Sequence, residues 1–176
     1  MHKFKAEIAK PNPKSTINSY RSFGYNLSTA IADIIDNSIS ANADSISISY
    51  KWSGQDSFIS IKDNGDGMNK DELVLAMTPG SKDPEDERSE KDLGRFGMGL
   101  KTASFSQCRS LTVTSRKQGA SDSCLRWDLD EIAKRDDGAW VLFEGVSPGS
   151  EARISPLEEQ LSGTLVLWEK LDRIVT

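Results

Sequence analysis

The chain has 176 residues, of which 36% are hydrophobic and 28% are charged, and its formal net charge is −5. This length and balance are typical of one soluble globular domain and indicate neither disorder nor membrane insertion. A net negative charge repels phosphate backbones, so we expect no binding of nucleic acid by this domain alone. No stretch approaches the ~20 apolar residues of a membrane span, and the N-terminus lacks a secretory signal, so the cytoplasm is the expected compartment.

The chain contains two cysteines, Cys108 and Cys124, and one histidine, His2. Two cysteines do not make a disulfide framework in a domain of this size, so we expect both thiols to be reduced and to lie in or near the core. A single histidine beside them cannot complete the four ligands of a zinc site.

The apolar pattern predicts a helix followed by two strands at the start of the chain. Apolar residues recur at helical spacing over 26–43, and they alternate over 45–52 and 58–62. Asn69 can cap the next helix, because Glu72 occupies the capping-box position.

A short helix is expected over 99–107, and four strands follow it. These strands span 111–115, 124–129, 139–144 and 163–169. Some connections between strands are too short for a crossover helix, which indicates antiparallel pairing. We therefore expect an α+β fold, a two-layer sandwich with helices on one face of a mixed, mostly antiparallel sheet.

Residues 81–92, SKDPEDERSEKD, carry charges of both signs and almost no apolar side chain. Such a segment cannot bury surface, so we expect an exposed loop. It is either a solvated linker or a lid, and the glycine-rich segment that follows it favours a lid over about residues 78–100.

Asp33 and Asn37 are four residues apart in the first predicted helix and therefore lie on one face of it. They border the apolar stripe, from which polar groups point into a cleft beside the core. The amide oxygen of Asn37 suits Mg²⁺, and the Asp33 carboxylate can orient or deprotonate an attacking water. The alternative is a pair of ordinary boundary residues. Asp36 lies further round, toward solvent, and is expected to be a surface or supporting residue.

The segment IKDNGDGM, residues 61–68, ends the second predicted strand. Asp63 has the parity of the buried isoleucines, so its carboxylate projects from the buried face and needs a donor, such as the exocyclic amine of a purine. Gly65 and Gly67 permit close backbone approach or a positive φ. An Asn-Gly or Asp-Gly hairpin turn is the alternative. A calcium loop is disfavoured, because no glutamate occupies its twelfth position.

A glycine-rich segment, LGRFGMGLKT, spans residues 93–102. Glycines before a helix expose backbone N–H groups, and a helix N-terminus attracts phosphate. Lys101 and Thr102 add a cation and a hydroxyl. The spacing fits neither a P-loop, which needs lysine directly after the last glycine, nor a dinucleotide fingerprint, which follows a strand. The alternative is a flexible hinge.

The order and spacing of these motifs, with Gly163-Thr164 opening the last predicted strand, resemble the GHKL superfamily. This superfamily is named for gyrase, heat-shock chaperone, histidine kinase and MutL proteins. The similarity runs from about residue 26 to residue 115, and DIIDNSI together with GRFGMGLKTAS is most similar to the MORC-like branch and its prokaryotic relatives. The resemblance implies a single Bergerat-type ATP-binding domain over residues 1–176, at the N-terminal part of a longer protein.

The resemblance also implies roles for individual residues. Asn37 would coordinate Mg²⁺ to the phosphates, Asp63 would hydrogen-bond the adenine amino group, and Thr164 would complete the adenine end. Asp33 would be the catalytic residue, and the cofactors would be ATP or ADP with Mg²⁺. The implied nucleotide-binding residues are Asn37, Asp63, Gly65, Gly67, Met68, Gly94, Arg95, Phe96, Gly97, Met98, Gly99, Leu100, Lys101, Thr102 and Thr164.

One departure from the superfamily concerns hydrolysis. Hydrolytic members carry glutamate where this chain has Asp33, whose carboxylate is shorter by one methylene. Geometry decides before pKa does whether a base reaches its water, so the departure bears on turnover and not on binding. Split-type members continue into a second domain, which supplies a lysine to the γ-phosphate and couples hydrolysis to dimerisation.

Three functions fit the sequence. We expect a slow, Mg²⁺-dependent ATPase switch that couples lid closure to partner contacts or to a nucleotide-dependent homodimer of the full-length protein. The second is a nucleotide-binding sensor or scaffold that does not hydrolyse ATP. The third is a protein kinase domain of the same superfamily, although a histidine kinase needs an acceptor histidine on an adjoining helix and His2 lies in none.

Overall fold

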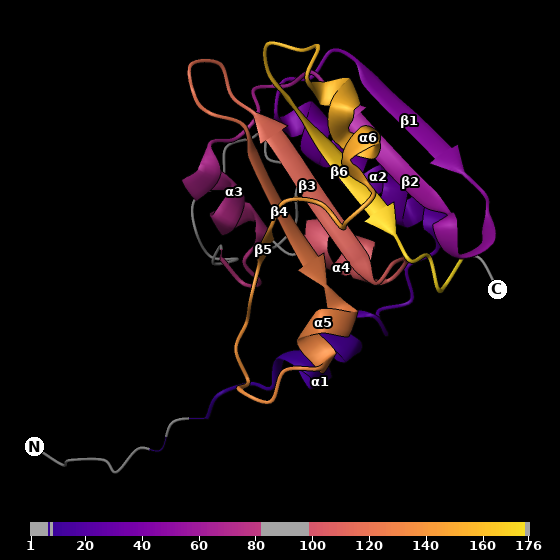
Figure 1. The fold of residues 1–176 in the computed structure, drawn as a ribbon, viewed down its shortest axis with the longest axis vertical. Coiled ribbons are helices and arrows are strands. Elements are labelled where there is room, and N and C mark those ends of the chain that lie inside the picture. Colours follow the sequence, from indigo (N-terminus) through magenta and orange to yellow (C-terminus); the bar gives the residue numbers. More distant parts are fainter. Residues whose placement is uncertain (1–6, 8, 82–98, 175–176) are drawn as a thin grey trace, which may run out of the picture.

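The computed structural model describes residues 7, 9–81 and 99–174 of the chain. A six-stranded sheet forms its centre, with the strands in the spatial order β1-β2-β6-β3-β4-β5 (Figure 1). All pairings between these neighbours are antiparallel. The strands are β1 (Ile46–Lys51), β2 (Phe58–Asp63), β3 (Ser110–Arg116), β4 (Ser123–Asp128), β5 (Phe143–Glu144) and β6 (Gly163–Glu169).

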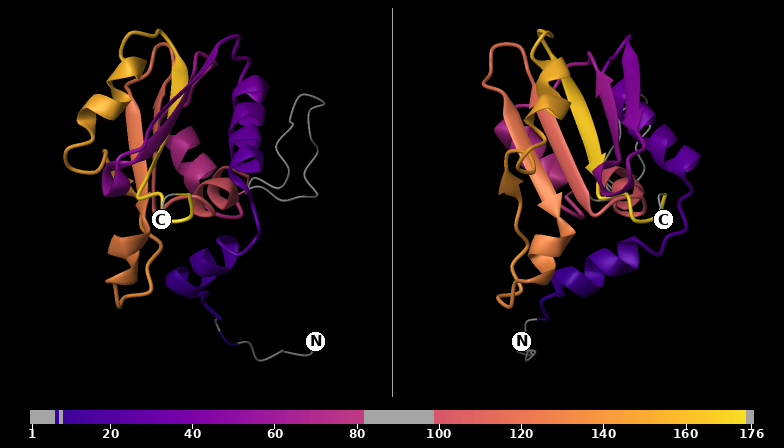
Figure 2. Two further views of the ribbon diagram at one scale, coloured as in Figure 1. Left: turned by 90° about the vertical axis from the view of Figure 1, so that its right-hand side faces the viewer. Right: turned by 45° about the vertical axis from the view of Figure 1, so that its right-hand side comes forward.

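Helices form a layer on one face of the sheet, as the left view of Figure 2 shows. They are α2 (Leu27–Ser40), α3 (Lys70–Met77) and α4 (Gly99–Phe105). The other face carries the short α6 (Glu151–Ile154) and the 3-10 turn η2 (Ser155–Leu157), while η1 (Gly54–Asp56) lies between β1 and β2. Two further helices, α1 (Pro13–Tyr20) and α5 (Leu129–Ala133), pack against each other at one end of the sheet. The predicted α+β two-layer sandwich is confirmed.

Side chains alternate along β6 between two cores. Val166 and Trp168 belong to the main core with the helices, whereas Leu165 and Leu167 pack with Leu157 on the other face. Because both faces are covered, every residue of β6 is buried. This burial explains why the strand reads as a continuous apolar run rather than as an alternating one.

Two helix starts agree with the sequence prediction. Asn26 caps α2, where its side-chain oxygen accepts a hydrogen bond from the Thr29 N–H at 2.8 Å. Asn69 and Glu72 form the reciprocal capping box of α3. Each cap satisfies N–H groups that the first helical turn leaves without a partner. The caps therefore fix where α2 and α3 begin and which of their residues face the sheet.

The strand predicted over 139–144 is wrong for most of its length, since β5 comprises Phe143 and Glu144. Gly138 has a φ of 64°, and the Asp137 carboxylate accepts a hydrogen bond from the Ala139 N–H at 3.1 Å. The chain therefore turns here instead of extending. Trp140 becomes partly buried by packing edge-on against Trp127 rather than by strand pairing.

β1 is an edge strand whose apolar side chains stay largely in solvent. The exposed fractions of Ile48, Tyr50 and Trp52 are 43%, 64% and 50%.

Both cysteines are free thiols, as predicted, with Cys108 buried and Cys124 half-buried. Among the described residues, no helix combines the length and apolar character needed to cross a membrane.

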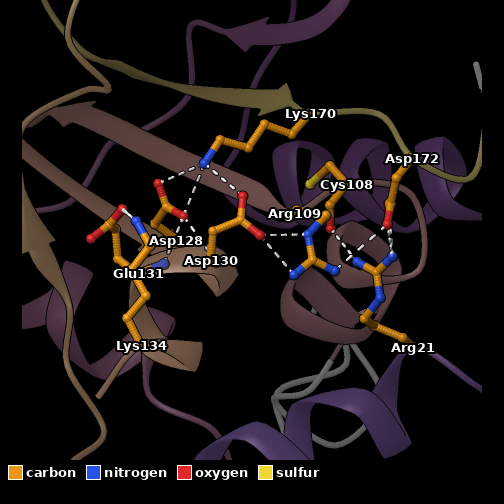
Figure 3. A network of polar contacts seen from close by, with 9 residues as sticks. All are labelled: Arg21, Cys108, Arg109, Asp128, Asp130, Glu131, Lys134, Lys170 and Asp172. Atoms are coloured by element: carbon orange, nitrogen blue, oxygen red, sulfur yellow. Dashed lines mark hydrogen bonds and ion pairs between the residues drawn. The ribbon is translucent and has the colours of Figure 1, made fainter. Parts of the chain in front are cut away.

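A polar network ties the start of the chain to the end of the sheet (Figure 3). Arg21, which follows α1 and is 5% exposed, forms two hydrogen bonds to the Asp172 carboxylate at 2.7 and 2.6 Å. Its guanidinium also donates to the Cys108 carbonyl at 2.7 Å. Arg109 extends the network to Asp130 of α5 at 2.8 Å. Because a buried guanidinium needs such partners, the segment that leads into α2 is fixed in place.

Candidate functional site

Asp63 ends β2 as a buried carboxylate, 6% exposed, beneath α2. Its Oδ1 accepts hydrogen bonds from the backbone N–H groups of Gly65 and Thr164, at 2.9 and 3.1 Å. Its Oδ2 accepts a hydrogen bond from the Ser38 hydroxyl at 2.8 Å. A carboxylate offers about four acceptor positions, so these three donors leave room for one more. The site is thus a preformed acceptor with capacity for one added N–H group.

The two glycines after Asp63 permit close backbone packing, as predicted. A Cβ at Gly65 would lie 2.6 Å from the Ala41 carbonyl oxygen, and a Cβ at Gly67 would lie 1.8 Å from the Arg116 carbonyl oxygen. Gly67 also has a φ of 68°. The loop continues into α3 and not into a paired strand, so the alternative of a hairpin turn is wrong.

Gly67→Ala is expected to lower the free energy of unfolding by more than about 2 kcal/mol, because a side chain meets both a left-handed backbone and a backbone oxygen. Gly119→Ala is the matched control, since Gly119 has a φ of 83° with no atom within 4 Å of its Cβ position. Urea unfolding of both variants isolates the cost of the close approach. Equal losses for the two variants would contradict the account.

Thr164 is the second residue of β6, lies beside the Asp63 carboxylate and is 9% exposed. Its hydroxyl shares a 2.8 Å hydrogen bond with the Ser115 hydroxyl, which also accepts from the Met68 N–H at 2.8 Å. The preceding Gly163, with a φ of 144°, packs so closely that a Cβ there would lie 2.2 Å from the Asp63 carbonyl oxygen. Strands β2, β3 and β6 therefore bring Asp63, Met68 and Thr164 together.

Asp33 and Asn37 are both half-buried on α2, one turn apart. Asp33 Oδ2 accepts a hydrogen bond from the Tyr25 hydroxyl at 2.8 Å. It also lies close to the start of α4, because a Cβ at Gly99 would be 3.7 Å from this oxygen. Within the described residues, the Asn37 side chain makes no hydrogen bond. Asp36 is half-buried rather than fully at the surface.

The last four residues of the glycine-rich segment, 99–102, form the start of α4. Lys101 is 1% exposed, and its ammonium donates to the Ala76 carbonyl at the end of α3, at 2.8 Å. Thr102 is 5% exposed beside Gly99, and Leu100 packs on the main core. The remaining predicted lid residues lie outside the described residues: Gly94, Arg95, Phe96, Gly97 and Met98.

Sequence reasoning missed three polar residues around Asp63. Ser38 donates to its carboxylate, Gln160 donates to its backbone carbonyl at 2.8 Å, and Ser115 bridges Met68 and Thr164. The sequence could have pointed to Ser38. It follows Ala30 and Ile34 at four-residue spacing on the buried face of α2, where a polar side chain needs a partner.

Known proteins are similar to this chain in sequence. The model of the histidine kinase-, DNA gyrase B- and HSP90-like ATPases matches residues 25–164. The chain belongs to this family. It is 31% identical to ATPase morc-1 of Caenorhabditis elegans over 97 residues, which cover 55% of this chain and 11% of that protein. It is 33% identical to the DNA mismatch repair protein MutL of Rhizorhabdus wittichii over 132 residues, which cover 73% of this chain and 21% of MutL.

The predicted resemblance to the GHKL superfamily and to its MORC-like branch is therefore confirmed. MutL of Aeromonas salmonicida is similar as well, with 36% identity over 100 residues, 54% of this chain and 16% of that protein. The chain spans between 11% and 21% of the length of these three relatives. Membership of this ATPase family supports adenine-nucleotide binding by the GHKL domain.

Proposed function

We propose that this domain is a Mg²⁺-dependent ATPase switch, in which nucleotide binding closes the lid and alters contacts with a partner or a second copy. The observation that carries the proposal is the buried Asp63 carboxylate with one open acceptor position. An amino group of adenine is a donor of the right kind, because it is neutral and can enter an apolar pocket. Met68, Gly65, Gly67 and Thr164 would form the walls of this pocket.

Mg²⁺ would be held at Asn37. Its side-chain amide is half-buried on the helix face that carries Asp33, and its oxygen is a ligand that suits this ion. Mg²⁺ keeps several waters and is often held by few protein ligands together with substrate phosphates. The residues present therefore fit the ion, whose role would be to neutralise phosphate charge.

The phosphates would lie against the start of α4. Gly99 and Leu100 would present backbone N–H groups, and the Thr102 hydroxyl lies one turn further on. We propose that Gly94, Arg95, Phe96, Gly97 and Met98 close over the phosphates as the lid. The Lys101 ammonium donates a hydrogen bond to the Ala76 carbonyl and so joins α4 to the end of α3. A phosphate contact of Lys101 would be additional to this structural role.

Asp33 would be the general base for water attack. It lies one turn before Asn37, and its Oδ2 lies near Gly99. The main alternative is a sensor or scaffold that binds nucleotide without hydrolysing it. The shorter side chain of Asp33 favours this alternative, and phosphate release by the full chain distinguishes the two. We place the switch in the cytoplasm, with homodimerisation in the full-length protein as its proposed output.

Asn37→Ala is expected to abolish the Mg²⁺ dependence of nucleotide binding while weaker, Mg²⁺-independent binding remains. The reason is that the amide oxygen contacts the ion and not the base. Titration of the variant with ADP in Mg²⁺ and in EDTA checks this. Asn18→Ala, on the exposed face of α1, is the control and should keep the dependence. Equal loss of affinity in both buffers would refute the metal role of Asn37.

A further inference from the structure

The candidate base Asp33 is held by a contact that no motif reveals. The Tyr25 hydroxyl donates a hydrogen bond to Asp33 Oδ2 at 2.8 Å. Tyr25 immediately precedes Asn26, the residue that caps α2, and Asp33 lies about two turns into that helix. The tyrosine hydroxyl thus reaches back over the first turns of α2 to meet the carboxylate.

Tyr25 itself is fixed by neighbours on two sides. Its carbonyl accepts a hydrogen bond at 3.0 Å from the side-chain amide of Gln107, which is 3% exposed. The side chain of Thr102 on α4 lies close enough to the Tyr25 hydroxyl to influence its pKa. Four residues upstream, Arg21 is anchored to Asp172 and Cys108 (Figure 3). A tyrosine whose backbone is held by Gln107 can impose an orientation on the partner of its hydroxyl.

The contact leaves Asp33 with one occupied and one available oxygen. Oδ2 carries the Tyr25 hydrogen bond, and Oδ1 receives no hydrogen bond from the described residues. An aspartate side chain has several staggered rotamers, and a fixed donor selects one of them. An ionised carboxylate also gains from such a donor more than a neutral acceptor does.

We propose that Tyr25 is a positioning residue for ATP hydrolysis: it fixes the Asp33 carboxylate beside the start of α4 so that Oδ1 faces the attacking water. The inference rests on the proposed ATPase function. Orientation matters more here than in relatives with glutamate, because the aspartate is shorter by one methylene. A misplacement of about 1 Å in a reacting geometry can cost about a hundredfold in rate.

The protonation of Tyr25 supports the same role. Burial and the hydrogen bond to Asp33 raise the pKa of Tyr25 above its ordinary value. The phenol therefore keeps its proton at neutral pH and acts as a donor. Its role beside Asp33 is therefore that of a donor and not of a base.

Tyr25→Phe in the full chain tests the proposal, because it removes the hydroxyl and keeps the ring. Steady-state phosphate release gives kcat and KM, and calorimetry gives the nucleotide Kd. We expect kcat to fall about ten- to a hundredfold, the scale of one hydrogen bond to a charged group, with Kd within about twofold of wild type. Tyr50→Phe, which removes an exposed tyrosine hydroxyl from β1, should change neither quantity.

A double variant separates positioning from a merely structural role. If Tyr25 acts through Asp33, Tyr25→Phe should not lower the residual rate of Asp33→Ala any further. An unchanged kcat in Tyr25→Phe would overturn the proposal while the ATPase function stands. If that variant shows both a higher nucleotide Kd and a lower Tm, the proposal is overturned in favour of a structural role for Tyr25. Absence of phosphate release by the wild-type chain would overturn the proposed function, and the role of Tyr25 with it.

Discussion

Asp63→Asn is expected to weaken adenine-nucleotide binding by about ten- to a hundredfold, which corresponds to the ~1–3 kcal/mol cost of a mispaired buried polar group. The carboxylate accepts from the Gly65 N–H, the Thr164 N–H and the Ser38 hydroxyl. An amide keeps one acceptor oxygen and turns the other position into a donor. If that donor faced the Gly65 and Thr164 N–H groups, or the purine amine, donor would meet donor, which is unfavourable. The Ser38 hydroxyl can rotate to accept from it, but the purine amine would still lose its acceptor.

Calorimetric titration with ADP measures this effect, and a melting curve of the same variant separates binding from folding. Asp56→Asn is the matched control, because Asp56 is an exposed carboxylate in η1 at the other end of β2. The control should bind like wild type. Undiminished affinity in a folded Asp63→Asn variant would show that the base pocket is not at the end of β2.

Asp33→Ala is expected to lower turnover to a small residual rate and to leave the Kd for ADP near the wild-type value. General-base catalysis contributes about 10²- to 10⁴-fold to a rate, so turnover should fall by about that factor. Binding should persist because the proposed adenine contacts are made by Asp63 and not by Asp33. Asp63 contacts α2 at Ser38, which lies more than one turn beyond Asp33.

Phosphate release and calorimetry on the same preparation check both halves of this prediction. Asp36→Ala serves as the control, because Asp36 is an acid of the same helix and is half-buried like Asp33. It should retain turnover. If Asp33→Ala still hydrolyses ATP at the wild-type rate, the base is another residue or a chain of waters.

Local signals in the sequence explain why much of the fold was predictable. Asn26 and Asn69 are strong N-caps, and the start of each helix follows from them. The alternation of β2 placed Asp63 on the buried face, where the structure has it. These features depend on residues close together in the chain, so pattern reasoning reaches them.

The unpredicted parts depend on contacts between distant segments. α1 is an amphipathic helix of eight residues whose end is held by Arg21 and Asp172, which are 151 positions apart. The predicted strand over 139–144 is shortened because the chain turns at Gly138 and Trp140 then packs on Trp127. The apolar pattern of these segments does not show either outcome, because distant partners complete both.

The site shows the same division between local and distant contacts. The glycines at 65 and 67 are readable as points of close approach, but the sequence cannot say that their neighbours are Ala41 and Arg116. Ser115 and Gln160 approach Met68 and Asp63 only through strand pairing. The nucleotide-binding roles of all these residues remain predictions.

Calorimetric titration of the purified chain with ADP and with a non-hydrolysable ATP analogue, each with and without Mg²⁺, decides whether this chain forms a nucleotide site. If Asp63 and Asn37 have the proposed roles, both nucleotides bind saturably and Mg²⁺ strengthens their binding. Absence of binding at millimolar nucleotide would contradict these roles, and would mean that the family's motifs persist in this chain without forming a nucleotide site.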